Sequence, residues 1–492
     1  MNRAKSFASK HQVILGSSPI FLAYLLGVFR ESAWSDDWQA LEAPDNDFRQ
    51  PLRDGRPLFA LFQKISFAVV SRDPSYLFML RFLSLIFLLL VYVLVGKRLG
   101  LKTTRDFILL SVSFTLPSFQ WFVYWATLWT WLLPILFSVV AGNVWGKEGS
   151  KRWFGVVPLV LAFLIYPINS LFAFSLLFVE GVILAIPINE LKKRLISLLK
   201  LYFLSTLISL MIIKLSLSIL HVAPSAKVTE NVSFDELPTK FWWWITRPVV
   251  TAFRPFFIDS PTNATAVMSS LPILLLVAFI LFKQTYELNE RIFVRVLFLS
   301  FTASIPLLPL LVAKQNQIDF RLVAAWDWGI IQVSFWYLAF LLDKFSRTKM
   351  IALILLVSFS TYQSNSNYVR TFLRPYEQKS LFLREEIDKC ETPLNIVVVP
   401  SKKEWPSYNL LGNFSTVTDL AHSWVPKPNV QFLAREKNLN RIINVTFTDS
   451  RDKSGDLPQS GVCVIDLEVY RLLLLKQLGS GLKSDLTKPS SK

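Results

Sequence analysis

The sequence predicts an all-α polytopic membrane bundle followed by a small C-terminal α/β domain. The chain is 52% hydrophobic and only 18% charged, whereas soluble domains carry about 25% charged residues. Its apolar residues occur in runs of about 15–22 residues, the length that crosses a bilayer. After about residue 364 these runs stop, and short β-branched segments bounded by turn residues replace them.

The strongly positive charge predicts membrane orientation rather than nucleic-acid binding. The formal net charge is +17, but many lysines and arginines stand in short clusters between apolar runs, as the positive-inside rule requires. Arg3, Lys5 and Lys10 precede the first run, and no small-residue cleavage site follows it. We therefore expect a multi-pass protein of the inner (plasma) membrane, with the bilayer as a partner, a cytoplasmic N-terminus and no nucleic-acid ligand.

Applied along the chain, the positive-inside rule predicts about eleven spans, with the C-terminus outside the cytoplasm. The interrupted apolar stretch at 58–70 predicts a helix that lies in the interface, because Gln63 and Lys64 break its apolar run. The expected spans are residues 13–29 and 76–95, a pair turning near Pro117, a pair turning near Tyr166 and Pro167, residues 195–220 and 271–282, one span reaching Lys314, one ending at Lys344, and residues 350–362.

The expected C-terminal domain lies outside the membrane. Residues 395–400 and 461–467 predict short buried strands, and residues 377–389 predict a helix. We expect three parts: a transmembrane domain at 1–363, an extracytoplasmic α/β domain at 364–480 and a disordered tail at 481–492.

Both cysteines of the chain, Cys390 and Cys463, fall in the expected extracytoplasmic domain. An oxidising compartment favours a disulfide between them. The alternative is a pair of buried thiols.

The acidic segment Trp34-Ser35-Asp36-Asp37-Trp38 follows the first expected span and is the strongest candidate site. Tryptophan favours the membrane–water boundary, because its ring is apolar and its N–H needs a polar partner. A carboxylate pair at this boundary stays hydrated, yet lies close enough to meet a lipid head group. Asp36 and Asp37 are therefore candidate catalytic bases, and Trp34 and Trp38 are candidate walls of a substrate cavity. The alternative is a solvated loop that ends a helix.

Four ionisable residues stand inside the apolar runs: Arg81, Glu180, Lys214 and Asp327. A charge at membrane depth is costly and usually faces a bundle interior or a cavity. Asp327 is expected in the outer half, on the side of the acidic segment, and is a candidate cavity residue. The alternative for each of the four is a structural ion pair.

The sequence indicates neither a metal site nor a nucleotide site. Its three histidines lie far apart and show no metal-ligand spacing. It contains no phosphate-binding P-loop, no dinucleotide-type glycine loop and no nucleophile elbow. We expect no metal centre and no cofactor; a divalent cation is left open and is not indicated.

The acidic pair in the first outer loop, followed about 20 residues later by Asp54-Gly55-Arg56-Pro57-Leu58 and an interfacial helix, resembles the GT-C superfamily of membrane glycosyltransferases. Within it the chain is most similar to the phage- and bacterium-encoded O-antigen glucosyltransferases of Gtr type II. The turn at Tyr166 and Pro167 fits that pattern, as does Arg321 near an outer helix end. The similarity covers roughly residues 10–360 and does not extend to the C-terminal domain.

The resemblance implies a membrane glycosyltransferase. Members of the superfamily take a sugar from a polyprenyl-phosphate carrier, use an aspartate of the first loop and commonly invert the anomeric carbon. The implied donor is thus a polyprenyl-phosphate-linked hexose, most simply glucose. The implied acceptor is a cell-surface glycan such as O-antigen or lipopolysaccharide, on the outer face of the membrane.

The residues fit this chemistry independently of the resemblance. A carboxylate can take the proton of the attacking hydroxyl, and a cation can stabilise the departing lipid phosphate. Arginine suits the phosphate because it pairs two N–H groups with two oxygens. The candidates are Arg56, then Arg321; Arg254 and its neighbour in the loop, Arg247, stand beside tryptophan and proline that favour lipid anchoring. The alternative for all four is snorkelling to head groups.

Two other functions are weighed against transfer. A polysaccharide ligase or polymerase also acts on lipid-linked glycans, but would rely more on arginine and histidine in a late loop. A lipid-linked sugar transporter or flippase would show repeats and symmetrically broken helices, and the sequence shows no clear repeat.

Overall fold

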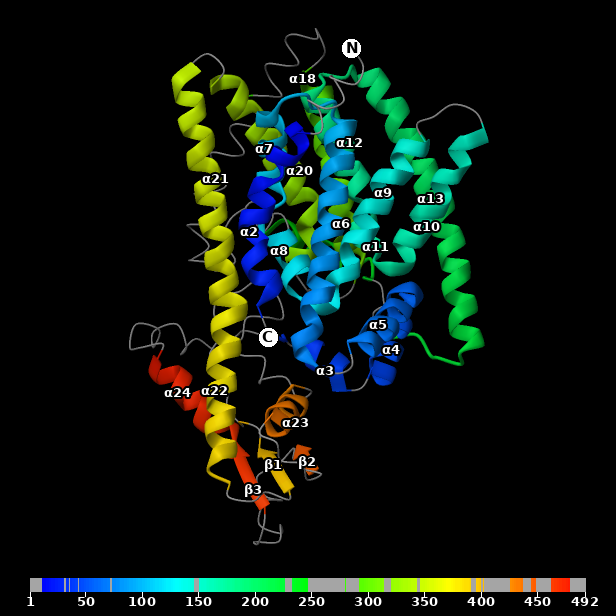
Figure 1. The fold of residues 1–492 in the computed structure, drawn as a ribbon. Coiled ribbons are helices and arrows are strands. Elements are labelled where there is room, and N and C mark those ends of the chain that lie inside the picture. Colours follow the sequence, from blue (N-terminus) through cyan, green and yellow to red (C-terminus); the bar gives the residue numbers. More distant parts are fainter. Residues whose placement is uncertain are drawn as a thin grey trace.

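A computed structural model shows a predominantly helical chain with a small parallel sheet at one end (Figure 1). The structure describes residues 11–30, 32–34, 36–42, 44–70, 73–145, 150–225, 232–246, 279, 292–313, 320–342, 346–390, 395–399, 401, 425–436, 444–447 and 462–477.

The helices that precede residue 184 form most of the bundle. They are α2 (Ser18–Phe29), α3 (Asp36–Glu42), α4 (Pro44–Arg53), α5 (Pro57–Val69), η1 (Pro74–Tyr76), α6 (Leu77–Arg98), α7 (Thr104–Ser113), α8 (Pro117–Tyr124), η2 (Ala126–Trp131), α9 (Leu132–Trp145), η3 (Ser150–Gly155), α10 (Val156–Ile165), α11 (Pro167–Ser170) and α12 (Phe172–Ile183).

The remaining helices complete the bundle and lead to the sheet. They are α13 (Ile188–Ile219), α15 (Leu237–Trp244), α18 (Ile292–Ser304), η5 (Ile305–Leu307), α19 (Leu308–Val312), α20 (Phe320–Leu342), α21 (Ser346–Tyr368), η6 (Val369–Leu373), α22 (Arg374–Asp388), α23 (Pro426–Glu436) and α24 (Leu467–Gln477).

Several helices are long and apolar enough to cross a membrane, as expected of a membrane protein. Among the described residues four qualify, or five if one bent pair counts as a single span. The structure therefore does not confirm the expected eleven spans, and the expected span at 271–282 lies outside the described residues except for position 279. The four are Pro74–Arg98, Ala126–Trp145, Ile188–Ile219 and Phe293–Val312.

Prolines explain why several expected spans are short or bent. Pro117 begins α8, and α7 and α8 meet at an angle of 75° instead of forming a simple hairpin. The break expected at Tyr166 and Pro167 is present: Tyr166 is extended, and Pro167 opens α11. Because proline removes a backbone donor and clashes with the preceding turn, the helices on either side stay shorter than a bilayer is thick.

Two buried charges in the bundle, those of Glu180 and Arg295, bind partners within the chain. Glu180 of α12 accepts two hydrogen bonds from Arg98 of α6, at 2.5 and 3.1 Å, and lies 3.8 Å from Arg194 of α13. Arg295 of α18 donates to the carbonyl oxygens of Gly181 and Ile186, at 3.0 and 3.1 Å. Glu180 is thus a structural ion pair, and Arg295 satisfies carbonyls where α12 ends.

The C-terminal part contains a three-stranded parallel sheet. The strands β1 (Asn395–Val399), β2 (Asn444–Phe447) and β3 (Val462–Asp466) have the order β2-β1-β3. The runs that predicted β1 and β3 do form strands, whereas β2 was not predicted. The central strand reads as a continuous apolar run because helices and neighbouring strands bury it, as is usual in parallel sheets.

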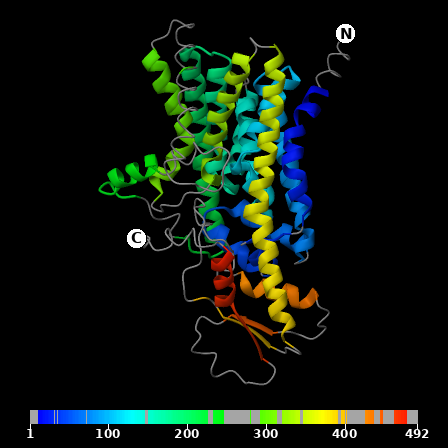
Figure 2. The ribbon, with the colours of Figure 1, turned by 90° about the vertical axis from the view of Figure 1, so that its left-hand side faces the viewer.

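The helix α21 continues through the π-helical turn η6 into α22 without a break. The three elements form one rod that runs from the bundle to the sheet (Figure 2). The composition change at residue 364 therefore falls inside the helix α21.

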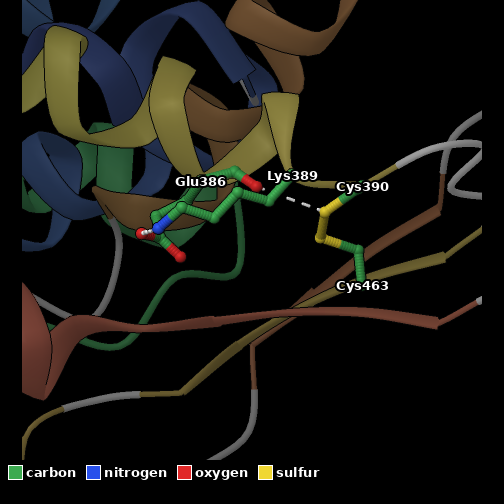
Figure 3. The surroundings of a disulfide bond; sticks show 4 residues. All are labelled: Glu386, Lys389, Cys390 and Cys463. Carbon is green, nitrogen blue, oxygen red and sulfur yellow. Dashed lines mark hydrogen bonds and ion pairs between the residues drawn. A yellow bond between two sulfur atoms is a disulfide. The ribbon is translucent and has the colours of Figure 1, made fainter.

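A disulfide joins the rod to the sheet. Cys390 follows the end of α22, Cys463 lies in β3, and the two sulfur atoms are bonded in the structure (Figure 3). Near the end of α22, Glu386 pairs with Lys389, the residue before Cys390.

We expect the chain to keep this bridge after purification, and the Cys463→Ser variant to be less stable by about 2–4 kcal/mol, because the bridge restricts a long loop in the unfolded chain. Thermal melting with and without a reductant measures the difference, and reduction should lower the wild-type midpoint to that of the variant. Two free thiols in the wild-type chain by non-reducing mass spectrometry would refute the bridge.

Candidate functional site

Asp36 and Asp37 of the acidic segment lie in the first turn of α3, where the helix dipole favours carboxylates. Asp37 is fully buried. Its Oδ2 accepts the backbone N–H of Trp34 at 3.0 Å, and its Oδ1 accepts the backbone N–H of Thr127 at 2.8 Å. Asp37 therefore fastens α3 to η2, a segment far away in the sequence.

Burial raises the pKa of the Asp37 carboxyl to about 6, because a charge is poorly solvated there. The positive charge of Arg81 and the two backbone N–H groups act in the opposite direction and favour the ionised form. Asp37 is thus ionised at neutral pH, and it takes up a proton in mildly acidic solution.

Arg81 of α6 binds backbone carbonyls close to the acidic segment. Its side chain is 1% exposed and donates to the carbonyl oxygens of Tyr124 at 2.9 Å, of Arg30 at 2.7 Å, and of Ser32. These carbonyls lie where α8 ends and where the chain leaves α2. A buried guanidinium with backbone acceptors and a nearby carboxylate is well satisfied, so Arg81 is a structural partner of the acidic segment.

The structure distinguishes the two neighbouring acids. Asp36 is partly exposed, whereas Asp37 has no exposed surface. A group that takes a proton from an acceptor hydroxyl must reach it within hydrogen-bond distance. Of the two acids, Asp36 therefore has surface that another molecule can contact, and Asp37 holds the helix that carries it.

We expect activity to fall as the pH drops through about 6. The sign follows from the raised pKa: above 6 Asp37 is a carboxylate that accepts both N–H groups, and below 6 its added proton removes one acceptor. The measurement is kcat/KM between pH 5 and 8. If kcat/KM fell only near pH 4, in the ordinary range of a carboxyl pKa, the ionisation of Asp37 would not control the site.

Arg56 stands in a tight turn before α5. Gly55 has a φ of +74°, a conformation that favours glycine, and Pro57 starts the helix. The Asp54 carboxylate accepts the Ser225 hydroxyl at 2.7 Å, which ties this turn to the segment after α13. The Asp-Gly-Arg-Pro sequence thus gives Arg56 a defined backbone position.

Two stacked aromatic rings support the Arg56 side chain. The guanidinium carbon lies 4.7 Å from the ring centre of Tyr166 and 5.9 Å from that of Trp131. The two rings are stacked with centres 3.7 Å apart, and both are buried. Because the π-faces attract the guanidinium while leaving its N–H edge uncovered, Arg56 can still present that edge to an anion.

The segment η2 connects the acidic and basic candidates. The backbone N–H of Thr127 is bound by Asp37, and the Thr127 carbonyl accepts the Gln63 side chain of α5 at 2.9 Å. Trp131, which lies beneath Arg56, ends the same segment. Four residues of a 3₁₀-helix span roughly 8 Å. The two charge types are therefore attached to opposite ends of one short element.

The other predicted site residues lie elsewhere or outside the described structure. Asp327 of α20 is buried in the bundle, where its Oδ2 accepts the Ser118 hydroxyl of α8 at 2.7 Å. The backbone of Arg321 belongs to α20, but its side chain is not described. Arg247 and Arg254 lie outside the described residues.

Trp34 and Trp38 are buried rather than exposed on a cavity wall. Trp34 packs against Phe372 at a ring distance of 5.5 Å, and Trp38 packs against Phe432 at 5.9 Å. Both rings therefore fix the acidic segment to the elements that carry their partners, η6 and α23.

Sequence reasoning did not identify three residues of this region: Thr127, Trp131 and Lys379 of α22, whose Nζ lies 5.2 Å from the ring centre of Trp38. Trp131 stands in an apolar run and Lys379 in an ordinary helix, so only the tertiary contacts reveal them. Within the described ranges, no group of three or more histidine, cysteine or acidic side chains is arranged to hold a metal ion.

No protein-family model matches the sequence, and a search of curated proteins found no match. The assignment of function therefore rests on the residues and their arrangement.

Proposed function

We propose that this chain is a GT-C-type membrane glycosyltransferase. It moves a hexose from a polyprenyl-phosphate carrier to a cell-surface glycan such as O-antigen or lipopolysaccharide. The observation that carries the proposal is the attachment of the acidic segment and Arg56 to the two ends of η2. An inverting transfer needs both groups around one anomeric carbon, with a base at the attacking hydroxyl on one face and a cation at the departing phosphate on the other.

The roles follow from exposure and contacts. Asp36 takes the proton of the acceptor hydroxyl as that oxygen attacks the anomeric carbon. The bond to the carrier phosphate breaks, and the phosphate leaves with the electron pair. Arg56 stabilises the departing charge with two parallel N–H groups. Asp37 is a positioning residue, because both its oxygens hold backbone N–H groups.

The proposal includes a membrane orientation. Helices α3, α4 and α5 lie at the same end of the molecule as the C-terminal sheet (Figure 1). The basic residues that end α6, Lys97 and Arg98, favour the cytoplasmic side for its far end. We place the acidic segment and the C-terminal part outside the cytoplasm, in a chain of about eleven spans.

The mass of the surface glycan tests the proposal. Cells that express the wild-type chain should carry one additional hexose per glycan repeat, compared with cells that lack it. Cells that express the Asp36→Asn variant at equal level should match cells without the chain. An unchanged glycan, with the wild-type chain correctly inserted, would exclude this transfer reaction.

A further inference from the structure

The rod formed by α21, η6 and α22 touches the acidic segment at two places. The first contact is made by Phe372 in the π-helical turn η6, a type of turn frequent at functional sites. The Phe372 ring centre lies 5.5 Å from that of Trp34, 5.1 Å from that of Trp121 and 5.6 Å from that of Tyr124. Trp34 is thereby held where the chain enters the acidic segment.

The second contact involves Lys379 on α22. Its Nζ lies 5.2 Å from the ring centre of Trp38, and the side chain is 1% exposed. The Phe432 ring of α23 also lies against Trp38, with the ring centres 5.9 Å apart. The Lys379 Nζ also lies 5.5 Å from the ring centre of Tyr376 on the same helix, so the buried ammonium group is held against two aromatic rings.

The two rod residues that make these contacts lie on one side of the rod, and their two tryptophan partners lie at the two ends of the acidic segment. Phe372 and Lys379 are seven residues apart, about two helical turns or roughly 10 Å, and so point to one side of the rod. Trp34 and Trp38 flank the two acids. One side of the rod therefore holds the acidic segment at both its ends.

The hydrophobic core shows the same association. Trp38, Ala40 and Leu41 of α3 belong to one buried cluster with Leu383 of α22 and Val430 of α23. The C-terminal part is therefore not packed around a separate core, and α3 completes it. A unit that shares its core with the candidate catalytic helix also controls how firmly that helix is held.

We propose that the C-terminal part belongs to the transferase site, and that Phe372, Lys379 and Phe432 are positioning residues that hold α3 and thereby Asp36. The kinetic consequence rests on the proposed function, whereas the structural consequence does not. Loosening α3 lowers the rate of transfer, because the base is then less often within reach of the acceptor hydroxyl.

Hydrogen–deuterium exchange of the full chain in detergent tests the structural part. Lys379→Met and Phe432→Ala should each raise exchange of the peptide covering residues 33–42 by about tenfold, since each removes a contact of α3. Leu381→Ala changes an exposed side chain on the same helix and should leave that peptide unchanged. Lys379→Met keeps an apolar chain of similar length, which guards against a general loss of folding in Phe432→Ala.

Steady-state kinetics test the functional part. We expect Lys379→Met to lower kcat by about tenfold with little change in the donor KM, because the donor phosphate is bound by Arg56 and not by α3. Wild-type exchange at residues 33–42 in both variants would overturn the proposal, whatever the activity. Faster exchange in a chain whose wild type transfers no sugar would uphold the contact and refute the proposed function instead.

Discussion

Asp36→Asn is expected to lower the rate of transfer by about 10²–10⁴-fold, the usual contribution of a positioned general base. The amide keeps the size of the side chain but cannot take the proton of the acceptor hydroxyl. Because Asp36 is partly exposed in the first turn of α3, the stability of the chain should change by less than about 1 kcal/mol, the usual contribution of a carboxylate at a helix N-terminus. Sugar transfer from a radiolabelled lipid-linked donor, at equal protein level, gives the measurement.

Asp37→Asn provides the matched comparison. Its amide N–H₂ must face either the N–H of Trp34 or that of Thr127, since the carboxylate accepts both. A lost acceptor in a buried site costs about 1–3 kcal/mol, so this variant should lose activity together with thermal stability. Asp73→Asn, which changes an acid between α5 and α6, should retain activity. Full activity in Asp36→Asn would remove the base from the mechanism.

Adjacent residues of one type cannot be ranked from the sequence, and the acidic pair shows why. The local pattern predicted a carboxylate pair after the first apolar run, and that pair does begin a helix. What separates the two acids is the N–H of Thr127, a partner 90 residues away. Tertiary packing buries Asp37, and this burial raises its pKa although the Thr127 N–H acts in the opposite direction. No local signal could therefore reveal either property.

Local patterns did predict several elements. The interrupted apolar run gave the helix α5, the Tyr166 and Pro167 pair gave a helix break, and the β-branched runs gave β1 and β3. The number of membrane spans was harder to predict from the sequence. A proline such as Pro117 can turn a chain back or merely bend it, and the 75° angle between α7 and α8 is decided by packing.

Outside the acidic segment, the sequence predicted Arg56 as a site residue but did not predict Lys379. Arg56 was predicted from the Asp-Gly-Arg-Pro turn, and the structure shows the aromatic pair that supports it. Lys379 stands in a helix predicted from composition, where a lysine normally faces solvent. Only the contact of its Nζ with the Trp38 ring makes it a candidate.

Arg56→Lys is the sharpest test of donor binding. A bidentate guanidinium makes two charge-assisted hydrogen bonds to phosphate, and an ammonium group cannot reproduce that paired geometry. Losing one such bond costs about 1.5–3 kcal/mol, which corresponds to roughly 10–100-fold in kcat/KM for the donor. The KM for the glycan acceptor should stay unchanged, because the acceptor is activated at Asp36. Transfer measured at limiting donor gives both values.

The control for Arg56→Lys is Arg53→Lys, which changes an exposed arginine three residues earlier, at the end of α4. An arginine that only reaches lipid head groups tolerates lysine, since a point charge serves nearly as well there. Arg53→Lys should therefore keep wild-type kinetics. If Arg56→Lys also kept the wild-type kcat/KM at limiting donor, Arg56 would be an anchoring residue. The stacked pair of Trp131 and Tyr166 would then support a membrane contact and not a phosphate site.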